Sequence, residues 1–302
     1  MLTGKLLRWA IAFTVTVTPC LSFSSPVAGI NKTYRPEVKI SRSPSSYDFD
    51  GEELKFKLYW TIFHVADSKS KVKRIDDKRL KFWGKVSTAG IASWFKKIED
   101  EGFSIWNEEK LSPEKTYIFQ KEGDYEREKV YTYDFKNKLV KYEKINPKKN
   151  KVQIKFVKMP EVPFFEDIVT SAYFFRKYGI FKVGKVTSFP LFAGGKFQNV
   201  SFKVVALEEI DTLFGKLKAY KVIPSNNLSP EGAFERKGKV VFWFTADRRH
   251  LPIKAVAEVA IGSVSAVLVD AKGKGFDLRK DTEKERRENL FRKILTGELG
   301  GE

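Results

Sequence analysis

The stretch of sequence that decides the fold is residues 240–268, VVFWFTADRRHLPIKAVAEVAIGSVSAVL. Residues 240–245 are apolar or aromatic, and the polar residues that follow turn the chain. Beyond this corner, Lys254 and Glu258 alternate with apolar residues, which is the period of a half-buried strand. Gly262 interrupts the alternation before it resumes. The stretch therefore predicts three antiparallel strands, and we expect the upstream strands to pair with them.

The same alternation recurs upstream and downstream of a single helical segment. Leu54, Phe56 and Leu58 share one face of a predicted strand that extends to residue 62. Other strands are predicted over residues 70–75, 80–87, 103–107, 115–120, 129–135, 139–145, 152–157, 186–192, 197–207 and 216–224. So many strands in sequence predict one large sheet, which at this size curls into an open, barrel-like shape.

A single packed helix is predicted at about residues 164–178, between the two sets of strands. Its apolar residues recur at helical spacing, and Gly179 follows as a C-terminal cap. We expect Glu166 and Asp167 in its first turn, where the helix dipole favours acids. Aromatic residues lie nearly all round this helix, so we expect it to pack against the sheet. The fold class is thus mainly β or α+β, with a large curved antiparallel sheet.

The N-terminal residues 1–28 resemble a cleaved signal peptide. A basic start is followed by a short apolar core and small residues, which predicts export to the periplasm. Cys20 is the only cysteine, and we do not expect it to be lipidated because Pro19 occupies a position where lipoprotein signals use a small residue. Removal of Cys20 with the signal peptide excludes disulfides and cysteine metal sites. We predict no transmembrane segment after signal removal.

The remaining boundaries follow from composition. Residues 29–47 contain several prolines and serines without periodicity, which predicts a flexible linker. A single β-rich domain is expected over residues 48–270. Residues 271–302 form a charged C-terminal tail with a predicted short helix, because Thr282 and Glu285 match a capping box.

The chain is strongly basic, with a formal net charge of +18 over 302 residues. A lysine- and glutamate-rich surface is common in heat-adapted proteins, and it also attracts anionic membrane surfaces. Nucleic acid is not an expected partner, because the aromatic residues alternate with lysine as a half-buried sheet requires and an exported protein rarely meets nucleic acid.

Catalytic motifs are absent from the sequence. It contains two histidines, no HExxH and no GxSxG, and Gly194-Gly195-Lys196 lacks the rest of a phosphate-binding loop. We therefore expect no enzyme activity, no metal and no cofactor. His64 is interpreted as a partly buried histidine with a local partner, and ligand gating is the alternative.

The corner at residues 247–250 is the densest cluster of functional groups. Arg248 and Arg249 are candidates for clamping a phosphate or carboxylate, since guanidinium offers paired donors. In the structural interpretation, which we favour, Asp247 caps the corner and Pro252 restarts the extended chain. Further candidate ligand-binding residues are the aromatic side chains expected to line the sheet and its helix, together with the strand histidine: Trp60, His64, Phe165 and Tyr173.

Several segments together resemble a known family. They are GEELKF at residues 51–56, EDIVTSAYFFR at 166–176, FGKLKAYKV at 214–222 and DRRHLPIK at 247–254. In this order they resemble the bacterial exported domain-of-unknown-function family 3108, over about residues 48–270. The resemblance implies a β-rich domain outside the cytoplasm and brings no reaction or ligand.

The sequence thus predicts a non-enzymatic periplasmic protein. Its curved sheet is expected to enclose an apolar space that binds a lipid-like envelope molecule, or to bind a partner in envelope assembly. One alternative is a scaffold with a solid core that uses its basic surface or C-terminal helix. A hydrolase that uses Asp247, Arg248, Arg249 or His64 is the other.

Overall fold

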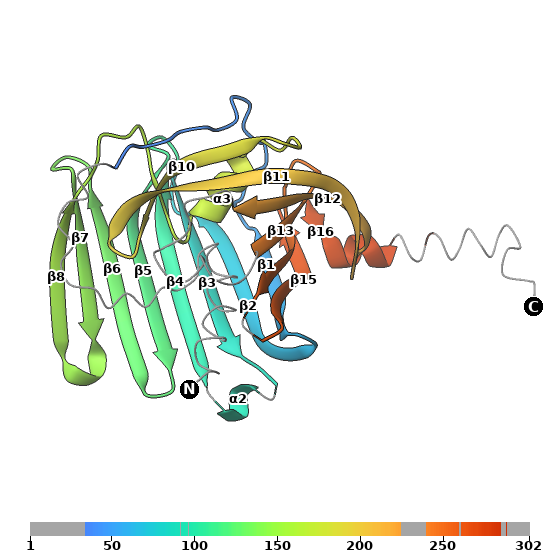
Figure 1. Ribbon diagram of the computed structural model, residues 1–302, viewed down its shortest axis with the longest axis horizontal. Coiled ribbons are helices and arrows are strands. Elements are labelled where there is room, and N and C mark those ends of the chain that lie inside the picture. Colours follow the sequence, from blue (N-terminus) through green and yellow to red (C-terminus); the bar gives the residue numbers. More distant parts are fainter. Residues whose placement is uncertain are drawn as a thin grey trace, which may run out of the picture.

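Strands with one apolar face dominate the computed structural model, which describes residues 34–90, 92–95, 97–224, 240–259, 261–284 and 288. These residues form one sheet of sixteen strands (Figure 1). The strands are β1 (Glu53–Trp60), β2 (Phe63–Arg74), β3 (Arg79–Thr88), β4 (Ile98–Asn107), β5 (Ser112–Glu122), β6 (Tyr125–Asp134), β7 (Leu139–Asn146), β8 (Lys151–Lys158), β9 (Glu166–Asp167), β10 (Val186–Ala193), β11 (Lys196–Thr212), β12 (Gly215–Pro224), β13 (Val240–Thr245), β14 (Pro252–Glu258), β15 (Ser263–Gly273) and β16 (Phe276–Asp277). The helical elements with assigned bounds are α2 (Ala92–Phe95), α3 (Ser171–Tyr178) and a 3₁₀ turn at Pro147–Lys149.

The sheet has two arms that meet at residues 240–268. Strands β1 to β8 form one arm in which each strand pairs with the next in the chain. Strand β15 pairs with β1, and β14 to β9 continue the sheet in reverse order. All neighbours in this path are antiparallel except β9 and β10. The predicted large curved antiparallel sheet is confirmed, and residues 240–268 lie at the junction of its arms.

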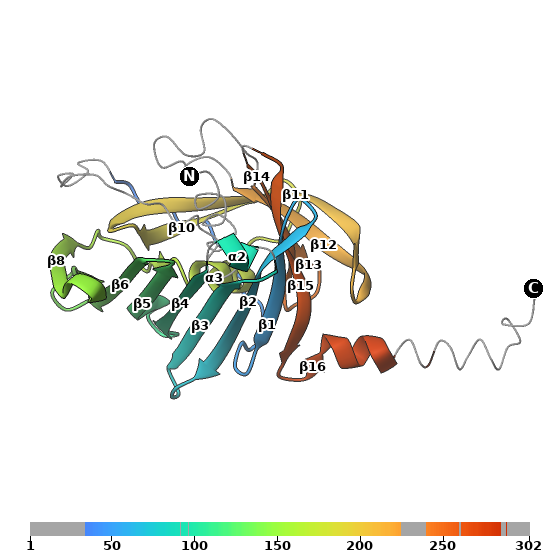
Figure 2. The same cartoon turned by 90° about the horizontal axis from the view of Figure 1, so that it is seen from below.

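Helix α3 is held between the two arms. In Figures 1 and 2, β10 and β11 lie across α3 and face β4 to β6. Phe82 of β3, Phe174 and Phe175 of α3, and Phe189 of β10 belong to one buried cluster, and each is at most 2% exposed. We call the sheet surface that turns toward α3 the inner face.

Two boundaries differ from the sequence-based expectations. Helix α3 begins at Ser171, because Glu166 and Asp167 form β9 and Asp167 turns the chain by accepting hydrogen bonds from the amides of Val169 and Thr170. Strand β1 ends at Trp60 and does not extend to residue 62, because the chain turns there, so His64 lies on β2.

The segments that flank the predicted domain also contribute to it. Within the predicted linker, Lys39 bridges Ser188 of β10, and Tyr47 is buried in the core. The last long strand, β15, continues to Gly273, and a helix over residues 278–284 begins four residues before the predicted capping box. The predicted signal peptide, including Cys20, lies outside the described residues, as does most of the tail.

A buried ion pair fixes the C-terminal end of α3. Arg176 donates through Nη1 and Nη2 to the two carboxylate oxygens of Glu52, at 2.7 and 2.6 Å. Both side chains are at most 1% exposed. The guanidinium also donates to the carbonyl of Arg249 and lies 4.8 Å from the ring centre of Phe49. The helix is thereby tied to the start of β1 and to the β13–β14 corner.

A buried carboxylate fixes the chain before the N-terminal end of α3. Asp167 accepts hydrogen bonds from Ser104 Oγ on β4, at 2.5 Å, and from Thr116 Oγ1 on β5. Its neighbour Glu166 is fully buried, and Trp106 Nε1 donates to its Oε1 at 3.1 Å. Oε2 of Glu166 has no hydrogen-bond partner among the described residues. Burial raises the pKa of Glu166 well above its usual range and so favours its neutral, protonated form.

Removing one partner of the Arg176–Glu52 pair should destabilise the fold strongly. Arg176→Ala leaves Glu52 as a buried unpaired charge, and we expect a loss of about 3–5 kcal/mol in the free energy of unfolding. Urea denaturation measures this loss. The matched control is Lys55→Ala, which breaks the half-exposed pair with Asp270 and should cost at most about 1 kcal/mol. Equal losses for the two variants would contradict the anchoring role.

The raised pKa of Glu166 predicts that the stability of the fold depends on pH. Its pKa in the folded protein lies above the value of about 4.3 for an unfolded chain, so the native state binds the extra proton between these pKa values. Its contribution to stability is therefore lost as pH rises through this window, by up to about 1.4 kcal/mol per pH unit.

Glu166→Gln removes this titration and should gain stability relative to wild type as pH rises from 5.5 to 8.5. Urea unfolding at each pH measures the difference between the two proteins. Glu161→Gln is the control, because this exposed carboxylate has a pKa below its usual value and remains ionised over the whole range. A constant difference between Glu166→Gln and wild type would refute a raised pKa.

Candidate functional site

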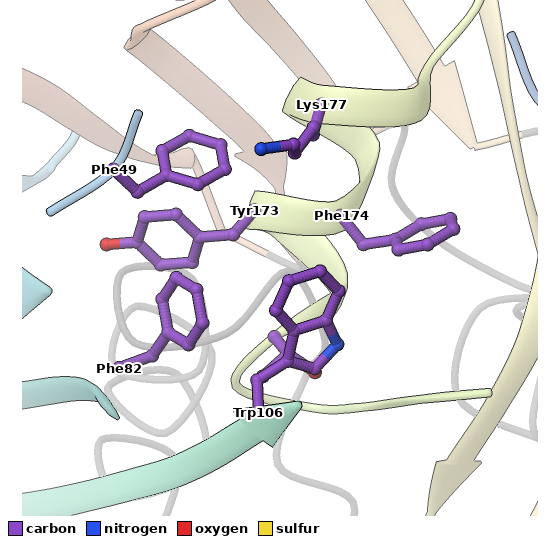
Figure 3. A pocket seen from close by; sticks show the side chains of 7 residues that line it. Phe49, Phe82, Trp106, Tyr173, Phe174 and Lys177 are labelled. Atoms are coloured by element: carbon purple, nitrogen blue, oxygen red, sulfur yellow. The ribbon is translucent and has the colours of Figure 1, made fainter. Parts of the chain in front are cut away.

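A small apolar cavity lies between α3 and strands β3 and β4. Its volume of about 10 Å³ holds about one water molecule. Figure 3 shows aromatic rings around it, with Tyr173 between Phe49 and Phe82. The lining residues are Phe49, Phe82, Trp106, Thr170, Tyr173, Phe174 and Lys177. The sequence predicts an apolar space lined by aromatics that admits a lipid, but α3 fills this space, so the cavity cannot hold an acyl chain.

The predicted aromatic ligand residues do not lie together. Trp60 ends β1, and its Nε1 donates to the carbonyl of Ile261 at 2.9 Å. Phe165 is buried beside β6, with its ring centre 5.2 Å from that of Tyr133. Tyr173 lines the small cavity, and its hydroxyl donates to Ser70 Oγ at 3.2 Å. These side chains occupy separate packing environments, and their ligand-binding role stays a prediction.

His64 has a local partner on its own strand. Its Nε2 lies 2.9 Å from Asp67 Oδ1 and 3.2 Å from the carbonyl oxygen of Ala66. Its ring also lies beside that of Tyr59, with 5.6 Å between the ring centres. These contacts account for its position at the β1–β2 hairpin.

Residues of the corner between β13 and β14 hydrogen-bond to one another. Asp247 Oδ1 accepts from the Arg249 amide at 2.8 Å, and Asp247 Oδ2 accepts from Arg249 Nε at 3.0 Å. Burial alone raises the pKa of Asp247, but the hydrogen bonds and charge of Arg249 bring it below its usual value. Arg248 is exposed, and Pro252 begins β14. Asp247 thus holds Arg249, and the role of the two arginines as a clamp stays a prediction.

His250 completes this corner. It adopts a positive φ of 44°, and its ring stacks on Phe181 with 3.7 Å between the ring centres. Its Nδ1 lies 2.9 Å from the carbonyl oxygen of Arg176. Burial lowers the pKa of His250 below its usual value, so the imidazole is neutral at neutral pH. It serves as a packing residue at the end of α3.

The inner face of β5 to β8 carries a different set of side chains. Strand register places Ile118 opposite Lys129, and Lys129 opposite Lys144. In the next row, Tyr131 stands opposite Tyr142, and their rings stack with 4.7 Å between centres. All but the buried Tyr131 are partly exposed. Apolar and cationic groups thus share one concave surface.

Sequence reasoning did not find this surface. Alternation along each strand indicates which residues share a face, but not which strand is the neighbour or how the residues align. Lysines at residues 129 and 144 lie in separate predicted strands. Only the pairing of β6 with β7 brings them opposite each other.

The positions of the acidic residues on this face also depend on strand register. Asp100 of β4 stands opposite Gln120 of β5, and Glu122 lies two residues further along β5. Burial is the main reason that the pKa of Asp100 rises to about 7, and the charge of Glu122 raises it further. Asp100 is thus partly protonated at neutral pH.

The described residues contain no group of three or more His, Cys, Asp or Glu side chains that could hold a metal ion. Among the same residues, no helix combines the length and apolar character needed to cross a membrane.

Three solved structures illustrate the likeness of this fold to others. One is a β-barrel-like protein of the domain of unknown function DUF1849 from Brucella abortus, with 8% identity, a TM-score of 0.47, and coverage of 75% of this chain and 98% of that chain. A protein described as exported, with a YmcC-like fold, from Bacteroides fragilis shows 12% identity, a TM-score of 0.31, and coverage of 74% and 96%. A protein described as a lipoprotein from Parabacteroides distasonis shows 9% identity, a TM-score of 0.27, and coverage of 74% and 95%.

These likenesses carry no argument about function, since every TM-score is below 0.5. No curated protein matches the chain. Nothing in the comparisons indicates catalysis. The family model does match, over residues 55–269, which is most of the sheet. The chain belongs to the family described as protein of unknown function DUF3108.

Proposed function

We propose that this protein is a non-enzymatic, exported protein of the periplasm that binds an apolar, lipid-like molecule of the cell envelope. The ligand would lie on the inner face of β5 to β8. The observation that supports this proposal is the amphipathic character of that surface. Ile118 and Tyr142 are partly exposed there and extend a buried cluster formed by Tyr131, Tyr133 and Phe192.

The position of the proposed binding surface follows from the position of α3. The helix packs beside Phe82 and Trp106 of β3 and β4, so the space over these strands is filled. Beyond it, the Gly194–Gly195 turn between β10 and β11 approaches β7, and the Cα of Gly195 faces the ring of Tyr142. Apolar side chains that are only partly covered, in the concave part of a curved sheet, are suited to an acyl chain.

A second candidate function is binding of a protein partner at the outer edge of the sheet. Strand β8 pairs with β7 on one side only. On the face opposite to the inner face, Val152, Ile154 and Phe156 are 55%, 51% and 65% exposed. An exposed edge strand with apolar residues can accept an added strand from a partner. This observation favours the scaffold alternative.

The lipid proposal predicts a stoichiometric adduct. The protein is purified from a bacterial periplasm, and lysophosphatidylglycerol is added before native mass spectrometry. We expect one lipid per chain. Ile118→Asn should weaken binding about tenfold or more, because a partly buried isoleucine contributes on the order of 1.5 kcal/mol to an apolar contact.

Val130→Asn is the matched control for this experiment. Val130 is equally half-buried but points to the opposite face of neighbouring strand β6. Its substitution should leave lipid affinity unchanged. If the wild-type protein takes up no lipid, the proposal fails. The edge strand β8 then becomes the surface to test. Phe156→Asp is the variant, and co-purification of a protein partner is the measurement.

A further inference from the structure

Four cationic side chains gather on the inner face of β6, β7 and β8. Lys129 stands opposite Lys144 across the β6–β7 pair, and Arg127 is two residues from Lys129 on the same face. Lys155 of β8 stands opposite Tyr142, which is two residues from Lys144. Directly opposite residues of an antiparallel pair have Cβ atoms about 5 Å apart. The register therefore holds four positive charges close together.

Two of these four cations donate hydrogen bonds to uncharged groups. Among the described residues, none of the four forms an ion pair. Lys129 Nζ donates to the amide oxygen of Gln120 at 2.8 Å, and Arg127 Nη1 donates to the carbonyl of Glu126 at 2.8 Å. Both acceptors are uncharged.

The outer face of the same sheet is arranged differently. There Lys69 and Lys71 both contact the carboxylate of Glu53, at 3.1 and 2.8 Å, and Lys141 contacts Glu143 at 2.9 Å. Like charges directly opposite each other destabilise a sheet, and opposite charges stabilise it. The inner cluster therefore carries a stability cost that the outer lysines avoid.

The acidic residues that face these four cations do not cancel their positive charge. Asp100 and Glu122 are the acids on the inner face of β4 and β5, and the pKa of Asp100 near 7 leaves it partly protonated. The pKa of Lys144 is lowered, first by burial and then by the charges of Lys129, Arg127 and Lys155. A bound anion would relieve this repulsion.

We propose that Arg127, Lys129, Lys144 and Lys155 bind a phosphate group. Guanidinium and ammonium groups donate charge-assisted hydrogen bonds to phosphate oxygens. This inference rests on the proposed function in one respect: the phosphate belongs to the headgroup of the lipid whose acyl chain contacts Ile118 and Tyr142. Lys129 stands opposite Ile118 and Lys155 stands opposite Tyr142 in the register, so one amphiphile spans both regions.

The test compares three probes by isothermal titration: lysophosphatidylglycerol, a monoacylglycerol of the same chain length, and inorganic phosphate. Lys144→Gln should weaken lysophosphatidylglycerol binding about tenfold and leave monoacylglycerol binding within twofold. Lys115→Gln is the control, because it removes the same charge from the opposite face of β5. It should change neither affinity.

Thermal unfolding without ligand provides a second measurement. Lys144→Gln should unfold at the same temperature as wild type or at a higher one, since it removes like-charge repulsion; a lower temperature would indicate a structural role and overturn the proposal.

The three probes also separate the two proposals. If both lipids bind equally and Lys144→Gln changes nothing, the lipid function stands and the phosphate site is overturned. If inorganic phosphate binds and Lys144→Gln abolishes this binding while neither lipid binds, the site stands and takes a soluble phosphate instead. If no phosphate-bearing probe binds, the phosphate site is overturned.

Discussion

The pair of Arg176 with Glu52 is the interaction on which the arrangement of α3 depends. A guanidinium that is 1% exposed requires a partner for its charge, and Glu52 meets it with both oxygens. The remaining donors reach the carbonyl of Arg249, which belongs to the corner between β13 and β14. One side chain thus connects the start of β1, the helix and the second arm of the sheet.

The position of α3 in turn decides what the curved sheet can enclose. The helix and the aromatic residues around it fill the space over β3 and β4, and a cavity of only about 10 Å³ remains beside Tyr173. Asp167 holds the other end by accepting hydrogen bonds from Ser104 and Thr116 of the sheet. A helix bonded at both ends and packed on aromatic rings is a permanent part of the core. The surface free for binding is therefore displaced along the sheet, toward β5 to β8.

On that surface, the proposed phosphate site comes at a cost in stability. Placing Lys129 directly opposite Lys144 is unfavourable for the sheet, whereas the outer face pairs its lysines with glutamates. Natural proteins retain such local conflicts where a site needs them. Apolar Ile118 and Tyr142 in the neighbouring positions give the surface both characters of an amphiphile.

The sequence by itself determined the strands, the family and the mainly β fold, because alternation along one strand is a local property. It predicted the three strands within residues 240–268 and the large curved sheet correctly. The sequence predicts a start of α3 that is too early, since Glu166 and Asp167 resemble the acids of a first helical turn, whereas Asp167 bonds to sheet residues more than 50 positions away. Only the tertiary structure decided the partner of Arg176, 124 residues distant, and the row that joins Lys129 to Lys144. Register and curvature are set by contacts between distant segments, and these contacts leave no periodic signal in the chain.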